Sequence, residues 1–166
     1  QITNRYNIEI KFNEKINYSL LPKPSFTSKN ISIIQDKKII GSVENFKIYI
    51  SIKNLFSFKS FDTKNIIFEK TDFNLKKKDL VFFNNLLDIQ PSNNRIIFKN
   101  SNIFFRDDND EILFINKINN SKLYYDAKNL KNVFTSRNEV FNVPYKIVIQ
   151  NDKFRKLFTS EFSSKK

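Results

Sequence analysis

The densest group of potential metal ligands in this sequence is the run Asp107-Asp108-Asn109-Asp110-Glu111. Carboxylate and amide oxygens are the ligands that hard cations such as Ca²⁺ prefer. A calcium loop of the EF-hand type also needs a glycine at its sixth position and a spaced set of ligands, and the run has neither. Asp and Asn are also frequent turn formers. We therefore interpret the run as a turn between two strands and predict no metal site.

The amino-acid composition excludes most other kinds of catalytic site. The chain has 166 residues, no His, Cys or Met, and a single glycine, Gly41. No thiolate nucleophile, histidine base or Cys/His zinc site can be built, and a glycine-rich phosphate loop needs several glycines. Paired carboxylates for hydrolysis would need an apolar cleft, and the sequence has no isolated pair in an apolar context. We expect no enzymatic activity, no catalytic residues and no cofactor.

The formal net charge is +12, from 29 Lys and Arg against 17 Asp and Glu. Such a balance can indicate a nucleic acid or an anionic membrane surface as partner. Basic residues beside aromatic rings, which could stack on bases, occur at Lys37-Lys38, at Lys47 with Tyr49, and from Lys122 to Tyr125. Lys and Asn are also common residues on the solvent-exposed face of a sheet. A basic nucleic-acid-binding domain is therefore a second alternative, and nucleic acid is not the expected partner.

The elements that position these residues are mostly strands. From Val43 to Ile52 the apolar residues Phe46, Ile48 and Ile50 alternate with polar neighbours, and Tyr6 to Leu20 shows the same period of two. Such runs recur every 8–12 residues between turn signals, which is typical of an antiparallel meander. We predict a mainly β fold, a curved antiparallel β-meander that forms a groove-like sheet.

Two segments depart from simple alternation. Residues 95–118 read as a central hairpin, in which consecutive apolar residues would make both faces apolar. Over about residues 76–88 the apolar residues Leu80, Phe83 and Leu87 recur at intervals of three and four. This spacing predicts one amphipathic helix, packed on the sheet, whose three apolar residues cap one end of it.

The length is that of one β-rich domain, residues 1–166. Because the chain has no initiator Met and no closing element after Phe162, we expect it to be a fragment of a longer chain. It contains no apolar run of the roughly 20 residues needed to span a membrane, and no secretory apolar region. An anchor or signal would have to precede Gln1.

Apolar stripes without chemically special residues could line a groove for acyl chains. Each buried methylene contributes about 0.8 kcal/mol, so a sixteen-carbon chain would gain roughly 12 kcal/mol before entropy costs. The candidate groove residues are apolar members of alternating strands: Ile8, Ile10, Phe12, Ile48, Ile50, Ile66, Phe68 and Ile147. The same side chains could instead simply fill a core, in a structural or assembly module that binds no lipid, and this alternative stays open.

The order of the segments resembles the N-terminal region of AsmA-like proteins of Gram-negative bacteria. The segments that carry the resemblance are Leu21-Pro22-Lys23-Pro24 with Ile31 to Ile33, Val43 to Leu55, Ile66-Ile67-Phe68-Glu69, the segment ending in Leu86-Leu87, Arg95 to Asp107, and Asn142 to Ile149. One departure is the absence of the glycines that many members carry near Asn100-Ser101, which we expect to alter a bulge.

The resemblance implies a location in the periplasm and an inner-membrane anchor formed by one N-terminal helix, which would precede Gln1. AsmA-like proteins are similar to bridge-like lipid-transfer proteins, in which a long curved β-sheet presents an apolar groove to phospholipids. The implied function is phospholipid transport between the inner and outer membranes, and outer-membrane biogenesis and homeostasis. The implied partners are phospholipids and other envelope proteins, and the resemblance transfers no catalytic residue.

Overall fold

The structure is a computed structural model that describes residues 9–55, 63–80, 94–152 and 157–164. About three quarters of the described residues lie in β-strands. The strands are β1 (Glu9–Phe12), β2 (Asn17–Ser19), β3 (Ser25–Gln35), β4 (Lys38–Ile50), β5 (Thr63–Leu75), β6 (Arg95–Arg106), β7 (Ile112–Asp126), β8 (Lys131–Val140), β9 (Val143–Asp152) and β10 (Leu157–Ser164). Two short 3-10 helices complete the described elements, η1 (Ile52–Leu55) and η2 (Lys77–Leu80).

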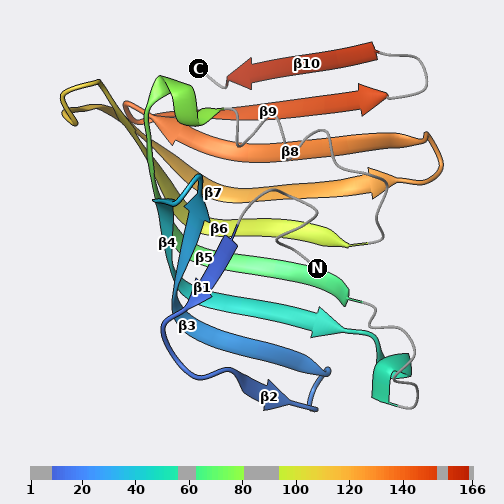
Figure 1. Ribbon diagram of the computed structural model, residues 1–166. Helices are drawn as coiled ribbons and strands as arrows, with labels where there is room; N and C mark the ends of the chain where they lie inside the picture. Colours follow the sequence, from blue (N-terminus) through green and yellow to red (C-terminus); the bar gives the residue numbers. More distant parts are fainter. Residues whose placement is uncertain (1–8, 56–62, 81–93, 153–156, 165–166) are drawn as a thin grey trace.

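All ten strands belong to one open sheet with the order β1-β3-β4-β5-β6-β7-β8-β9-β10, and β2 pairs with β3 beside β1 (Figure 1). Every pair is antiparallel except β5 with β6, which run parallel. The predicted mainly β fold is confirmed. The predicted antiparallel meander is wrong at this one pair, because the sheet is mixed and only mostly antiparallel. A parallel pair requires a crossover connection, and β5 and β6 are separated by residues 76–94 in the sequence.

The predicted amphipathic helix over residues 76–88 is not supported. Its described part contains only η2, a single 3-10 turn in which the N–H of Asp79 donates to the carbonyl of Lys76 at 2.9 Å. The Asp79 carboxylate in turn accepts the Lys76 N–H at 2.9 Å, which closes the turn locally. The described residues contain no α-helix, and residues 81–88 lie outside them. Three consecutive lysines at the start also oppose the dipole of a longer helix.

The central hairpin is confirmed as β6 and β7, which pair from Ile96 with Leu123 to Arg106 with Ile112. Its return strand is longer than predicted and reaches Asp126. Consecutive apolar residues on both faces would need cover on each, but at the tip Leu113 and Ile115 are exposed. Only the face that contains Ile96, Phe98 and the residues in register with them is buried.

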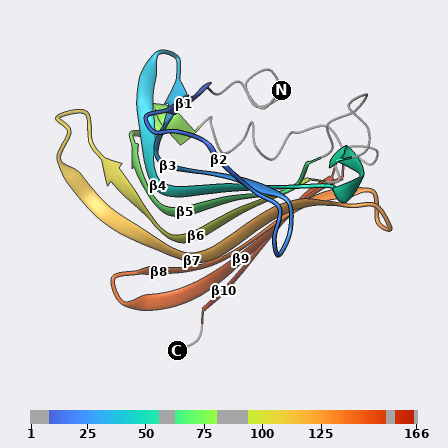
Figure 2. The same ribbon diagram turned by 90° about the horizontal axis from the view of Figure 1, so that it is seen from below.

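The sheet is strongly curved (Figure 2). Each of the strands β3 to β7 carries two successive outward residues at the same level: Lys29-Asn30, Glu44-Asn45, Glu69-Lys70, Lys99-Asn100 and Asn119-Asn120. We call this set the bend row. Strand β8 has no extra residue there, and the pairing of β7 with β8 shifts between Ile118 and Asn120. Because extra residues of this kind bend and twist strands, their alignment across five strands curves the whole sheet.

The core lies on one face of the sheet. Its buried apolar side chains come from β3 to β7: Ile31, Ile33, Ile40, Val43, Phe46, Ile66, Phe68, Phe73, Leu75, Ile96, Phe98, Ile103, Ile118 and Leu123. Aromatic rings run across it, with centroid distances of 5.8 Å for Phe12–Phe46, 5.1 Å for Phe46–Phe68 and 4.9 Å for Phe68–Phe98. We call this the inner face. Strand β1, which supplies Phe12, lies on the concave side of the curved sheet (Figure 2).

Candidate functional site

The most extensive feature of the inner face is a continuous row of apolar residues at one level of the sheet. Each member is the direct register partner of the next, across seven strands from β3 to β9. The row, which we call the apolar track, consists of Phe26, Ile48, Ile66, Ile96, Leu123, Phe134 and Ile149. Six strand spacings of about 4.8 Å make it roughly 29 Å long.

Exposure varies along the inner face. The centre of the apolar track, at Ile66, Ile96 and Leu123, is buried. Phe134 and Ile149 are half-buried and pack against the core. On β10, Phe158 and Phe162 are 57% and 66% exposed, and the register places both on the same face as Ile147 and Asn151 of β9. The accessible apolar part of the inner face therefore lies over β8 to β10.

The structure brings most of the predicted groove residues onto this face. Ile48 and Ile66 belong to the apolar track. Phe68 and Ile147 lie on the next level, in one row of register partners that Phe46 extends beyond Phe68 and Phe162 extends beyond Ile147. Ile50, Ile66 and Phe68 are buried and belong to the packed part of the inner face, whereas Ile147 is half-buried. These positions were predictable because alternation assigns one face to each strand.

The remaining predicted residues are placed differently. On β1, Ile10 packs against the core, and Phe12 is 39% exposed while its ring contacts Phe46. Ile8 lies outside the described residues. Of the three predicted cap residues, Leu80 ends η2, and Phe83 and Leu87 lie outside the described residues.

A strip of neutral polar side chains, which the sequence analysis missed, crosses the inner face on β7 to β9. The Tyr145 hydroxyl donates to Oδ1 of Asn116 at 2.8 Å, and the Ser136 hydroxyl donates to Oδ1 of Asn138 at 2.6 Å. Burial raises the pKa of the Tyr145 hydroxyl. Single Ser and Asn residues within strands give no periodic signal, so only the register shows that they lie together.

The outer face carries two pairs of a lysine and a tyrosine. Lys47 lies over the ring of Tyr49 and Lys122 over the ring of Tyr124, each with Nζ 4.8 Å from the ring centroid. The two pairs are separated by the width of β5 and β6, and Tyr125 belongs to the opposite face from Tyr124. Each tyrosine ring is covered by its own lysine. This arrangement is found on ordinary solvated strand faces and is not specific to surfaces on which nucleic-acid bases stack.

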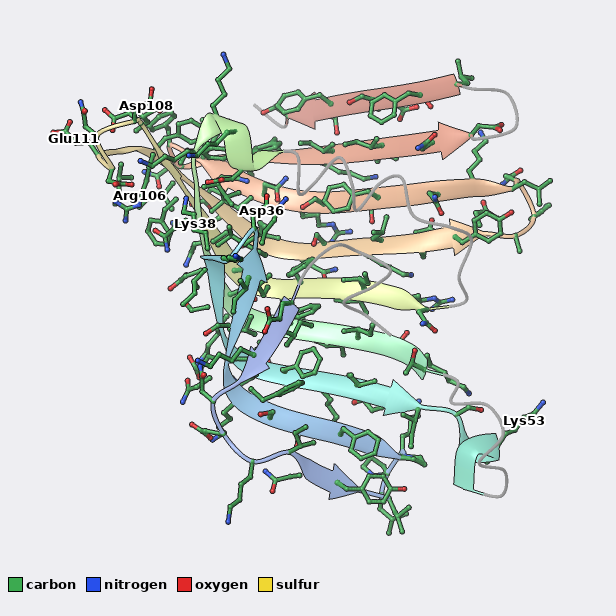
Figure 3. All side chains as sticks on the ribbon, in the orientation of Figure 1. Asp36, Lys38, Lys53, Arg106, Asp108 and Glu111 are labelled. Carbon is green, nitrogen blue, oxygen red and sulfur yellow. The ribbon has the colours of Figure 1, made fainter. Side chains whose placement is uncertain are left out.

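The charged residues at one end of the sheet are paired among themselves. Oδ1 of Asp107 accepts the N–H groups of Asn109 and Glu111 at 2.9 Å, which confirms the predicted turn. Lys76 Nζ lies 2.9 Å from Oδ1 of Asp110, and this hydrogen bond holds the pKa of Asp110 below its usual value. Figure 3 shows Asp108 and Glu111 at the tip of the β6–β7 hairpin, at the opposite end of the sheet from Lys53. Within the described residues, no group of three or more acidic side chains is placed to hold a metal ion.

A polar pocket of about 410 Å³ lies on the outer face at the bend row. Its side chains already bond to one another: Lys70 Nζ lies 2.9 Å from Oε1 of Glu44, and the Asn102 amide donates to Asp72 at 2.8 Å. The Lys70 hydrogen bond holds the pKa of Glu44 below its usual value. The charged side chains that line the pocket, Glu44, Lys70 and Asp72, therefore each have a partner within it.

Comparison of the chain with protein-family models gives no match, and comparison with curated proteins gives none either. Within the described part of the chain, no helix combines the length and the apolar character needed to cross a membrane.

Proposed function

We propose that the inner face of this sheet binds the acyl chains of phospholipids and that the chain is an AsmA-like β-groove module. The observation that carries the proposal is the apolar track, which crosses seven strands without a polar interruption. In this proposal the module acts in the periplasm, with an inner-membrane anchor formed by a helix before Gln1, and takes part in phospholipid transport between the two membranes. Phospholipids and other envelope proteins are its partners.

The acyl chain enters at the accessible part of the inner face. Phe158 and Phe162 are mostly exposed, and Ile147 and Ile149 beside them are half-buried, so apolar surface is available there without disturbing the packed part of the inner face. Each methylene that leaves water on this surface contributes about 0.8 kcal/mol. The headgroup stays in water, and movement along the face is passive because no step requires a catalytic group.

The test is the lipid content of the purified protein, measured by native mass spectrometry after incubation with phospholipid vesicles. Phe158→Ser together with Phe162→Ser removes the accessible apolar surface, and we expect bound lipid to fall several-fold. Leu157→Ser is the matched control, because Leu157 is 51% exposed on the same strand but points to the outer face. We expect this control to retain its lipid.

The competing function is a structural module whose inner face is filled by its own side chains. The burial of Ile50, Ile66 and Phe68 is what favours it. If the unmodified protein carries no lipid in the same measurement, the lipid proposal fails and the structural module stands.

A further inference from the structure

The two edges of the sheet differ in how they are protected. At one edge β1 and β2 contain only four and three residues, and Pro22 and Pro24 follow β2. Short strands and prolines are common devices that prevent edge-to-edge pairing. At the other edge β10 has eight residues, all of them exposed, with Glu161 as its single charged residue and no proline.

The edge of β10 that faces away from β9 has no strand beside it among the described residues. Within that part of the chain its backbone N–H and C=O groups on that side have no strand partner, and an edge with a single charge and no proline is a template for a further strand. The alternating apolar side chains Phe158 and Phe162 would be partly covered by such a strand. An unguarded edge of this length points to a pairing partner.

We propose that the partner is a second copy of this chain, which pairs antiparallel through its own β10 about a two-fold axis at Ser160. The sequence of the strand is self-complementary in that register. Phe158 lies opposite Phe162 of the second copy, and Thr159 lies opposite Glu161 of the second copy. Each aromatic pair forms twice because the interface is symmetric, and directly opposed aromatic side chains are favourable cross-strand pairs.

Of the two nearest alternative registers, the one centred on Thr159 places Phe158 opposite Ser160 of the second copy and loses the aromatic pairs, and the one centred on Glu161 is disfavoured further. A shift that centres the axis on Glu161 places Glu161 directly opposite Glu161 of the second copy, and like charges at opposed positions are destabilising. The same shift places Phe162 opposite Ser160 of the second copy, so both aromatic pairs are lost. The register centred on Ser160 avoids the repulsion and gains the aromatic contacts.

This pairing would join the two inner faces into one surface. A two-fold axis perpendicular to the sheet keeps the inner face of both copies on the same side, with the four Phe side chains at the junction. The inference rests on the edge itself and holds whether or not the inner face binds lipid, and its tests contain no lipid measurement.

The first test is sedimentation velocity over a range of protein concentrations at low and high salt. We expect a species of twice the 19.8 kDa chain mass, favoured several-fold by high salt because salt screens the repulsion between two chains of charge +12. Phe162→Lys should abolish this species. Phe141→Lys is the matched control, since Phe141 is 77% exposed in the β8–β9 turn away from the edge, and it should dimerise as the parent does. A monomer at all concentrations would overturn the proposal.

The second test uses the absence of cysteine from the chain. Directly opposed strand residues lie within disulfide range, with Cα atoms about 4.5 to 5.5 Å apart. Under mild oxidation we expect Ser160→Cys to cross-link at least tenfold faster than Glu161→Cys. Equal rates, or faster cross-linking of Glu161→Cys, would overturn the register centred on Ser160.

Discussion

Phe68 and Phe98 stack with their ring centroids 4.9 Å apart and their planes inclined by 16°, and they are direct register partners on the parallel strands β5 and β6. Every other pair of neighbouring strands from β3 to β10 is antiparallel. A parallel pair cannot be joined by a tight hairpin turn, so side-chain contacts are needed to fix its register. The stacked rings supply such a contact at the centre of the core.

We expect Phe98→Ala to lower the free energy of unfolding by about 3–5 kcal/mol, because the ring is buried and its loss leaves a cavity. Ile97→Ala is the control, since Ile97 neighbours Phe98 on β6 but points to the outer face and is half-exposed. Its cost should be about 1 kcal/mol. Urea unfolding followed by circular dichroism measures both values, and equal losses would contradict the assignment of the core to one face.

A second prediction concerns a buried hydroxyl. Oγ1 of Thr71 is fully buried and has no hydrogen-bond partner among the described residues, while the Thr71 N–H donates to Oγ of Ser101 at 3.1 Å. Thr71→Val keeps the shape and removes the unpaired hydroxyl, so we expect the protein to become more stable by about 1 kcal/mol. Ser101→Ala removes the partner of a buried N–H and should cost about 1–3 kcal/mol. Opposite signs in urea unfolding are the expected result, and a loss of stability in both variants would contradict it.

The sequence predicts those features of the fold that depend on neighbouring residues, and it does not predict those that depend on the tertiary arrangement. Alternation in Val43 to Ile52 correctly identifies strand β4, which ends at Ile50, because the face to which each residue points is a local property. The same period in Tyr6 to Leu20 predicts a strand with one apolar face, but Ile16, Tyr18 and Leu20 on that face are exposed. These residues belong to or flank β2, an edge strand of three residues, and edge position is a tertiary property that periodicity does not contain.

The candidate site is predictable to a similar extent. Ile48 and Ile66 were identified from alternation alone, but their direct opposition in the apolar track depends on register, which single strands do not encode. Phe158 and Phe162, the accessible part of the inner face, were missed. Their exposure follows from the position of β10 at the edge of the sheet, and apolar character alone does not reveal the order of the strands. The parallel pairing of β5 with β6 was missed for the same reason.

The bend row yields a third prediction. Asn30, Lys70 and Asn100 have φ values of 51°, 54° and 47°, in the left-handed region that glycine favours. Asn tolerates this region and β-branched residues do not. We expect Asn100→Val to cost about 1–2 kcal/mol and Asn100→Gly to change stability by less than half of that. Lys99→Val, at the adjacent outward position without a positive φ, should lie within about 0.5 kcal/mol of the parent in urea unfolding. If the two Val variants are equally stable, backbone strain at the bend row is excluded.

The last prediction concerns pH. Burial raises the pKa of the Asp79 carboxyl, but the Lys76 N–H and the Lys38 ammonium, 3.0 Å away, outweigh this effect and hold the pKa below its usual value. A carboxyl whose pKa is lowered by folding stabilises the protein above its unfolded pKa of about 3.9, and this stability is lost as the pH falls through the folded pKa. Asp79→Asn should therefore cost about 1 kcal/mol at pH 7, and the difference from the parent should vanish near pH 2.

The control for this titration is Glu44→Gln. Glu44 is paired with Lys70, but both side chains are more than half exposed, so water and salt screen the interaction. We expect the Glu44→Gln variant to follow the parent across the acid range within experimental error. Thermal unfolding from pH 2 to pH 7 measures all three proteins. A constant difference between Asp79→Asn and the parent over this range would show that the Asp79 carboxylate charge does not stabilise the link between η2 and the β3–β4 turn.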